Sequence, residues 1–238
     1  MTLNELRREV LEANLELVRR GLVLYTFGNA SGLWPDERLV VIKPSGVPFE
    51  ELSPESLVVT DLEGRPVEGR LKPSTDLATH LEIYRAFDGV GGIVHTHSAY
   101  ATAWAQARRE IPCFGTTHAD YGRGPVPLTA PLRPEEIEID YERNTGRAIV
   151  RRFENLSPRE APWVLVSGHG PFCWGASPKE AVFHAVMLEE IARLAWLTLA
   201  IEPGAAALPQ VHIDRHFLRK HGPQATYGQS PSGGPHQK

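Results

Sequence analysis

Two histidines stand two residues apart at the end of a short apolar run, in the segment Gly91-Gly92-Ile93-Val94-His95-Thr96-His97-Ser98. In a β-strand, residues i and i+2 point to the same face, so the imidazoles of His95 and His97 are predicted to project together from the end of a strand. Neutral imidazole is the commonest protein ligand for zinc and related divalent metals. The pair alone leaves two interpretations open: a metal site, or two histidines that only cap a loop.

A third histidine favours the metal site. His169 also follows an apolar strand and lies between Gly168 and Gly170, which leave room for close approach at the strand end. Catalytic zinc sites typically use three protein ligands and keep one open position, so His169 is the natural third ligand. His80 and His184 lie within predicted helices beside apolar neighbours, where a histidine without a metal is the better interpretation.

Small and hydroxyl-bearing residues form three candidate anion-binding segments. They are Gly28-Asn29-Ala30-Ser31, Lys43-Pro44-Ser45-Gly46 and Ser74-Thr75, and Lys43 adds a positive charge. Backbone N–H groups in such turns can bind phosphate, although each segment is also an ordinary turn sequence. Beside a metal site, the three together predict a phosphorylated substrate. Asp76, at a predicted helix start, is either a carboxylate favoured by the helix dipole or an oxygen ligand or base beside the metal.

The composition favours a small, soluble substrate. The chain has 238 residues, a net charge of -4 and no run of lysine or arginine longer than a pair, so we expect no nucleic-acid or membrane partner. It contains only two cysteines, Cys113 and Cys173, and we find neither a signal-peptide core nor an apolar run of ~18 residues, which predicts a reduced, cytoplasmic protein. The usual motifs of dinucleotide binding, ATP hydrolysis and HExxH metalloproteases are absent.

The elements that position these residues are short strands and helices. Thr2 and Glu5 have the spacing of a capping box, and a helix is predicted from there to about residue 20. Residues 116–132 are rich in Gly, Pro and Thr and are predicted to form a functional loop. The pattern predicts an α/β sandwich whose strands need not all be parallel. Further helices are predicted over 75–87, 98–108, from 134 and over 177–200, and strands over 23–27, 38–42, 57–60, 66–67, 163–166 and in the segment that carries His95 and His97.

These residues, with several further segments, resemble the L-ribulose-5-phosphate 4-epimerase family, which belongs with the class II, zinc-dependent sugar-phosphate aldolases. The resemblance runs from near residue 3 to 229 and implies a single domain over 1–229 with the class II aldolase-like fold, a three-layer α/β/α sandwich around a central, mostly antiparallel sheet. Residues 230–238 lack apolar side chains and are predicted to be a disordered tail. The matching segments are Gly28-Asn29, Lys43-Pro44-Ser45-Gly46, Lys72-Pro73-Ser74-Thr75-Asp76, His95-Thr96-His97-Ser98, Gly115-Thr116-Thr117-His118-Ala119-Asp120-Tyr121, His169-Gly170-Pro171-Phe172, His216-Phe217-Leu218-Arg219-Lys220-His221-Gly222 and Tyr227-Gly228-Gln229.

The resemblance implies a metal site and a phosphate site. His95, His97 and His169 would hold zinc, or another divalent metal, with Asp76 at or near the ion. Thr75 stands where the family commonly has serine, and it retains the hydroxyl. The substrate, chiefly its phosphate, would be contacted by Gly28, Asn29, Lys43, Ser45, Gly46, Ser74 and Thr75.

The resemblance also implies a site shared between subunits. Asp120 and Tyr227 would be the acid/base pair, contributed by a neighbouring subunit of a cyclic homotetramer, and His216 would assist nearby. From their local sequence alone, a loop-capping aspartate is the better interpretation of Asp120, and an apolar anchor for the C-terminus is the better interpretation of Tyr227. The tail begins three residues after Tyr227, and we expect it to be inert.

The implied activity interconverts L-ribulose 5-phosphate and D-xylulose 5-phosphate in pentose and L-arabinose catabolism. The C4 hydrogen is not adjacent to the C2 carbonyl, so simple proton abstraction cannot invert that centre. Because the dinucleotide motif is missing, carbon–carbon cleavage and re-addition remain, with zinc as the Lewis acid. The family's aldolases typically have glutamate in place of Asp76 and asparagine in place of Thr96, which favours the epimerase. The alternatives are a class II sugar-phosphate aldolase or dehydratase, and an interaction module like the adducin head domains, which resemble this fold but lack the zinc histidines.

Overall fold

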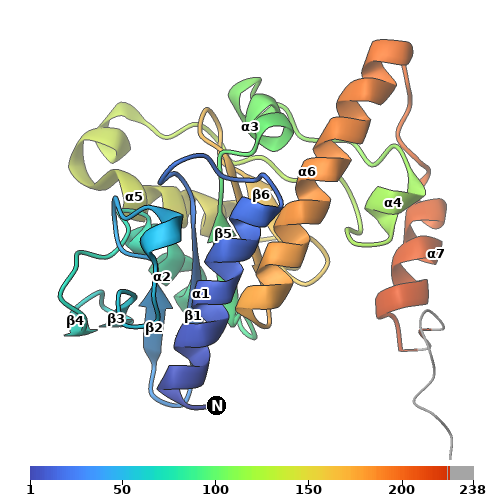
Figure 1. Cartoon of the computed structure of the whole chain (residues 1–238). Helices are drawn as coiled ribbons and strands as arrows, with labels where there is room; N and C mark the ends of the chain where they lie inside the picture. The colour runs from blue at the N-terminus through green and yellow to red at the C-terminus, as the bar shows by residue number, and fades with distance from the viewer. Residues whose placement is uncertain (224, 226–238) are drawn as a thin grey trace, which may run out of the picture.

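Seven strands form one sheet at the centre of the molecule (Figure 1). The computed structural model describes residues 1–223 and 225. The strands are β1 (Asn29–Trp34), β2 (Leu39–Ile42), β3 (Val58–Asp61), β4 (Pro66–Glu68), β5 (Gly92–His95), β6 (Trp163–Leu165) and β7 (Pro171–Gly175). They lie in the order β4-β3-β2-β1-β5-β7-β6, and the pairings between them are antiparallel. The antiparallel sheet that the resemblance implies is therefore confirmed.

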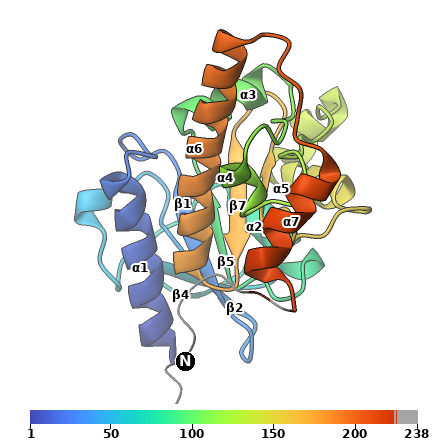
Figure 2. The ribbon, with the colours of Figure 1, turned by 90° about the vertical axis from the view of Figure 1, so that its right-hand side faces the viewer.

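Helices cover both faces of the sheet and complete three layers (Figures 1 and 2). One face carries α1 (Leu3–Arg19), α3 (Ala99–Gln106) and α6 (Pro178–Ile201), and the other carries α2 (Leu77–Ala86) and α5 (Pro134–Arg152). Side chains alternate between the faces of a strand, and both faces of β5 are buried. Ile93 packs in the core under α2 and α5, whereas its neighbour Val94 packs under α1, α3 and α6. The predicted α/β/α sandwich is confirmed.

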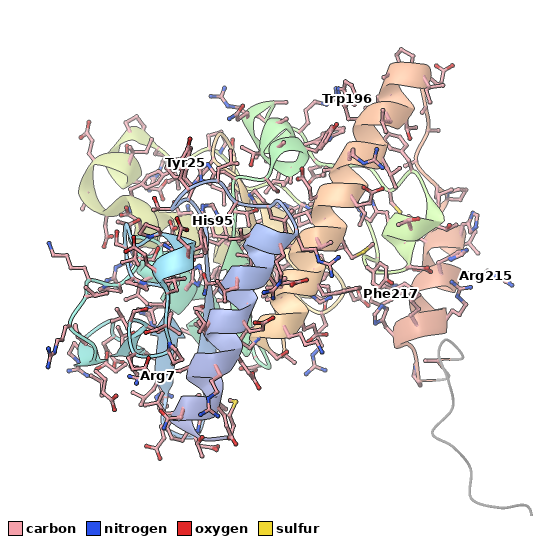
Figure 3. The ribbon with its side chains drawn as sticks, in the orientation of Figure 1. Arg7, Tyr25, His95, Trp196, Arg215 and Phe217 are labelled. Carbon is pink, nitrogen blue, oxygen red and sulfur yellow. The ribbon has the colours of Figure 1, made fainter. Side chains whose placement is uncertain are left out.

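The remaining helices are η1 (Phe49–Glu51), α4 (Thr116–Ala119) and α7 (Gln210–His221). Figures 1 and 2 show α4 beside α7, on the opposite side of α6 from α1. Cys113, Ala119 and Ile213 are buried together in a small core that joins these two helices. Figure 3 shows Phe217 pointing from α7 toward α6, while Arg215 points away. Among the described residues, no helix is both long and apolar enough to cross a membrane.

The first helix begins where its capping residues predict. The Glu5 backbone N–H donates to Thr2 Oγ1 at 3.3 Å, and the Thr2 N–H donates to Glu5 Oε2 at 2.6 Å, so the capping box is present. At the start of α6, Ser177 caps the Glu180 N–H and Pro178 occupies the first turn. The Glu180 carboxylate, however, accepts from the Ala176 N–H and does not complete a reciprocal box.

The predicted strand over 23–27 is wrong. The segment is a loop, and β1 begins only at Asn29. Leu24, Tyr25 and Phe27 are exposed and only Val23 packs in the core, so the segment lacks the regular buried face of a strand. Tyr25 also has a φ of 52°, in the left-handed region that an extended strand cannot contain. Of the apolar residues that suggested a strand, Phe27 instead lines the cleft described below.

Other elements differ in extent from their predictions. The strand predicted to carry both histidines ends at His95, so His97 lies just beyond it. Strand β7 was not predicted, because Pro171 and Gly175 at its ends mask a short buried run. The helix predicted from residue 134, without an end, runs for 19 residues across a kink at Asp140. The loop predicted over 116–132 includes α4. The tail predicted over 230–238 lies outside the described residues.

Close packing of β5 against the start of α6 depends on a glycine. A Cβ atom added at Gly92 would lie 2.3 Å from the Pro178 nitrogen and 2.4 Å from the Ser177 carbonyl carbon and oxygen. These are backbone atoms, which cannot move aside as the end of a flexible side chain can. Because β5 leads directly to His95, this packing also sets the position of the candidate metal ligands.

We predict that Gly92→Ala lowers the free energy of unfolding by about 1–3 kcal/mol, the usual cost of overpacking. Gly124→Ala is the matched control, since nothing lies within 4 Å of a Cβ atom added there, and it should change stability by less than about 0.5 kcal/mol. Urea denaturation of both variants measures the difference. Equal midpoints for Gly92→Ala and the wild type would contradict the packing argument.

Candidate active site

Antiparallel pairing brings three histidines from distant parts of the chain together. His95 ends β5, His97 follows it, and His169 lies in the turn between β6 and β7. The His97 Nε2 atom lies 3.1 Å from His95 Nε2 and 3.2 Å from His169 Nε2. Figure 3 shows His95 in the interior of the ribbon. Among the described residues, these three form a group whose ligand atoms lie within 4.8 Å of one another.

The hydrogen bonds of the histidines suit a metal. The Pro171 carbonyl can only accept, so His95 Nδ1 donates to it at 2.9 Å and leaves the lone pair on Nε2. Two imidazoles on one tetrahedral zinc, with bonds of 2.0–2.1 Å, hold their nitrogens roughly 3.3 Å apart, close to the separations in the triad. Partial burial and the neighbouring His95 and His97 imidazoles lower the pKa of His169 to about 4, which keeps its ring neutral. The donor set therefore fits a divalent metal, and binding itself stays a prediction.

Asp76 lies beside the triad but outside its compact group of ligand atoms. It stands at the start of α2, and Asn29 Nδ2 donates to its Oδ2 atom at 2.7 Å. Burial alone would raise the pKa of Asp76, but the nearby His95 and the Asn29 hydrogen bond contribute to holding it below its ordinary value. Asp76 is thus a fixed carboxylate at neutral pH, and its direct ligation of a metal stays a prediction.

One cleft of about 370 Å³ contains the triad, Asp76 and all of the predicted substrate contacts. Two loops meet to form one of its walls: the Ser45 N–H donates to the Lys72 carbonyl and the Ser74 N–H to the Lys43 carbonyl, each at 2.9 Å. The predicted contacts that line the cleft are Gly28, Asn29, Lys43, Ser45, Gly46, Ser74 and Thr75. Their convergence agrees with the predicted site, although substrate binding stays a prediction.

Lys43 is a buried cation that lines this cleft. Its side chain is fully buried, and Nζ donates only to the adjacent Pro44 carbonyl at 3.3 Å and lies 4.8 Å from the centre of the Phe49 ring. No carboxylate within the described residues forms an ion pair with it. Burial lowers the pKa of Lys43. A buried charge normally has a partner of opposite sign, so the cleft suits an anionic ligand.

The cleft also contains residues that the sequence did not indicate: Thr26, Phe27, Tyr141 and Glu142. The Phe27 ring stacks on His97 with centroids 6.3 Å apart, and the Tyr141 hydroxyl lies 3.2 Å from His169 Nδ1. Burial raises the pKa of Tyr141. No local signal marks Tyr141 and Glu142, because their place in the cleft depends on the packing of α5.

Asp120 lies away from this cleft in its own chain. It caps α4 and binds α7: its Oδ1 atom accepts from His216 Nδ1 and from Arg219 at 3.0 Å each, and Lys220 lies 3.3 Å from its Oδ2 atom. Burial alone would raise the pKa of Asp120, but the hydrogen bonds from His216, Lys220 and Arg219 hold it below its ordinary value. Neither Asp120 nor His216 lines the cleft, and Tyr227 lies outside the described residues. Their catalytic roles stay predictions.

The fold and the whole sequence match known proteins. Residues 8–196 match the family described as the class II aldolase and adducin N-terminal domain. The chain belongs to this family. The L-ribulose-5-phosphate 4-epimerases UlaF of Salmonella typhi and Salmonella paratyphi A are each 47% identical to it over 227 residues, 95% of this chain and 100% of theirs. The family resemblance drawn from the sequence is therefore confirmed.

Solved structures of the family share the fold. An L-fuculose 1-phosphate aldolase superposes with a TM-score of 0.76 at 24% identity, covering 89% of this chain and 94% of its own. YgbL of Klebsiella pneumoniae gives a TM-score of 0.73 at 29% identity, covering 90% of this chain and 99% of its own. The family membership and the histidine triad together indicate a metal-dependent enzyme.

We predict that the wild-type protein binds one zinc ion per chain and that His97→Gln weakens binding more than about 100-fold. Loss of a direct ligand should exceed the 10–100-fold effect typical of a lost outer-shell partner. Competition with a chromophoric chelator measures the affinity. His212→Gln, at an exposed histidine of α7, is the control and should bind zinc as the wild type does. Equal affinities for all three proteins would exclude the triad as the site.

Proposed function

We propose that this protein is an L-ribulose-5-phosphate 4-epimerase that interconverts L-ribulose 5-phosphate and D-xylulose 5-phosphate. The observation that carries the proposal is the cleft in which the histidine triad and the buried Lys43 charge lie together. One ligand that spans both must combine metal-binding oxygens with an anionic group, as a sugar phosphate does. The full-length match to relatives named L-ribulose-5-phosphate 4-epimerase supports this substrate among sugar phosphates.

Zinc is the metal we propose for the triad, held by His95, His97 and His169. When bound, it supplies a Lewis acid that polarises substrate oxygens and stabilises negative charge on them. The chain itself orients the ligands, because the Pro171 carbonyl fixes the tautomer of His95. Asn29 holds Asp76 beside the site, so that its carboxylate is ready to bind the metal or a substrate hydroxyl.

The phosphate site keeps the two halves of the substrate together in the proposed reaction. A base removes the C4 hydroxyl proton, the C3–C4 bond breaks, and glycolaldehyde phosphate forms beside a three-carbon fragment that retains the bonding electron pair. The aldehyde then rotates and presents its other face to the three-carbon fragment. The C3–C4 bond forms again, and the C4 oxygen takes a proton. Lys43 and the hydroxyl groups of Ser45, Ser74 and Thr75 would hold the phosphate throughout, because charge-assisted hydrogen bonds are the strongest available. Retention of the aldehyde separates an epimerase from an aldolase.

We infer that the proton transfers need a neighbouring subunit of a homotetramer. Asp120 and Tyr227 are the proposed acid/base pair, and Asp120 does not line the cleft of its own chain. Apolar side chains of α6 and α7 are exposed on one copy, with Trp196 53% and Val211 77% exposed. Exposed apolar residues of this size support association with further copies. The two cysteines, both free and buried, support a location in the cytoplasm.

The proposal predicts that the zinc-loaded protein converts L-ribulose 5-phosphate to D-xylulose 5-phosphate. Lys43→Met should lower kcat/KM about 10- to 150-fold, the equivalent of a lost charged hydrogen bond of about 1.5–3 kcal/mol. A coupled assay with identification of the products by NMR measures both effects. Free glycolaldehyde phosphate as the main product would indicate the aldolase instead.

Lys179→Met is the matched control for Lys43, because Lys179 is exposed at the start of α6, away from the cleft. It should retain wild-type kcat/KM. If the protein binds zinc but does not convert this substrate, the remaining candidate function is that of a related sugar-phosphate aldolase or dehydratase. If it binds no stoichiometric metal, an interaction module is favoured.

The shared site predicts complementation between inactive subunits. Mixing His97→Ala with Tyr227→Phe should restore partial activity, because some interfaces then join an intact triad to an intact tyrosine. Mixing His97→Ala with His169→Ala should restore none, since every triad remains damaged. Activity after verified subunit exchange is the measurement, and no recovery in the first mixture would show that each site is built within one chain.

A further inference from the structure

Tyr141 reaches the cleft because α5 is interrupted immediately before it. Asp140 has φ −157° and ψ 73°, outside helical geometry, so α5 consists of two helical parts that meet at a kink. The residue after such a break takes a direction that a continuous helix would not give it. Tyr141 lines the cleft, and its hydroxyl lies 3.2 Å from His169 Nδ1.

The backbone around Tyr141 is held firmly. Thr145 Oγ1 donates to the Tyr141 carbonyl at 2.9 Å, and Thr79 Oγ1 of α2 donates to the Glu142 carbonyl at 2.6 Å. Helices α2 and α5 are in close contact here, since a Cβ atom at Gly146 would lie 2.6 Å from Glu82 Cβ. These contacts fix the backbone from which the Tyr141 side chain extends toward His169.

The direction of the Tyr141 hydrogen bond follows from the triad. His169 turns Nε2 toward His97 Nε2, and a neutral imidazole that ligates a metal through Nε2 carries its hydrogen on Nδ1. His169 Nδ1 is then the donor and the tyrosine oxygen the acceptor. The Tyr141 hydroxyl hydrogen is left for a different acceptor, and the cleft is where a substrate oxygen would lie.

We propose that Tyr141 is a further positioning residue of the site. It accepts from His169 Nδ1 and so holds Nε2 toward the other two histidines, and it directs its own hydroxyl hydrogen at a substrate oxygen. His95 receives the same orientation from the Pro171 carbonyl, which is backbone and does not depend on the side chain at that position. Tyr141 is therefore a side chain whose hydrogen bond lets the sequence tune the triad. The second half of this proposal rests on the proposed function, whereas the first half rests only on the metal site.

Tyr141→Phe tests the first half by zinc affinity. Removal of the hydroxyl should weaken zinc binding 10- to 100-fold, as is typical for a lost outer-shell partner. Competition titration of the metal-free protein with a chromophoric chelator gives this value without any activity measurement. Tyr100→Phe is the control, since the Tyr100 ring packs beside Trp196 and does not line the cleft. Equal zinc affinity for Tyr141→Phe and the wild type would overturn the positioning role.

A measurement on the wild type keeps the test independent of how the variant folds. In zinc-loaded protein labelled with ¹⁵N histidine, the His169 Nδ1 resonance should show a bound hydrogen, with Nε2 as the metal-bound nitrogen. A His169 ring with its hydrogen on Nε2, or bound to zinc through Nδ1, would contradict the assigned direction of the hydrogen bond.

Activity at saturating zinc tests the second half. With the metal site filled, Tyr141→Phe should still lose about 3- to 10-fold in kcat/KM for L-ribulose 5-phosphate, as expected for one neutral hydrogen bond. Full activity at saturating zinc would overturn the donor role. If the wild type fails to convert this sugar, the proposed function fails, while the zinc titration still decides the positioning role.

Discussion

The site depends on the hydrogen bond from His95 to the Pro171 carbonyl. This one bond joins residues 76 positions apart, where the end of β5 pairs with the start of β7 inside the sheet. It also settles which nitrogen of His95 carries the lone pair. The position of His169 follows from the same pairing, because it lies just before β7. The register of two strands therefore sets both the spacing of the triad and the tautomer of His95.

The rest of the fold serves to keep that register. Ile93 and Val94 place β5 in the cores on both faces of the sheet, and Gly92 lets the start of α6 lie against the strand. A slip of one residue would exchange the two faces of β5 and expose what is now buried. Such a strand can hold imidazoles in a fixed position at its end.

The parts of the fold and of the site that the sequence predicts are those marked by a local pattern of residues. Thr2 and Glu5 mark the start of α1, and the apolar residues before His95 mark a buried strand, so both follow from spacing alone. The anion-binding segments around Lys43 and Ser74 are visible as turns with hydroxyls and a charge. That they share one wall of one cleft depends on loop pairing, which no local pattern encodes.

The residues that the sequence did not indicate are placed by tertiary contacts. Tyr141 enters the cleft through a break at Asp140 inside an otherwise helical pattern. The apolar residues of 23–27 suggest a strand, but Tyr25 adopts a left-handed conformation and Phe27 stacks on a ligand histidine. In both cases, the local preference is overridden by the geometry that the site requires.

The burial of Lys43 couples folding to the presence of ligand. A desolvated ammonium without a counter-ion weakens the folded state, and a phosphate dianion bound as proposed would remove that penalty. Ligands that bind only the native chain stabilise it by mass action. The thermal resistance of this protein should then follow the concentration of phosphorylated sugar around it, so that the molecule is most durable when its substrate is plentiful.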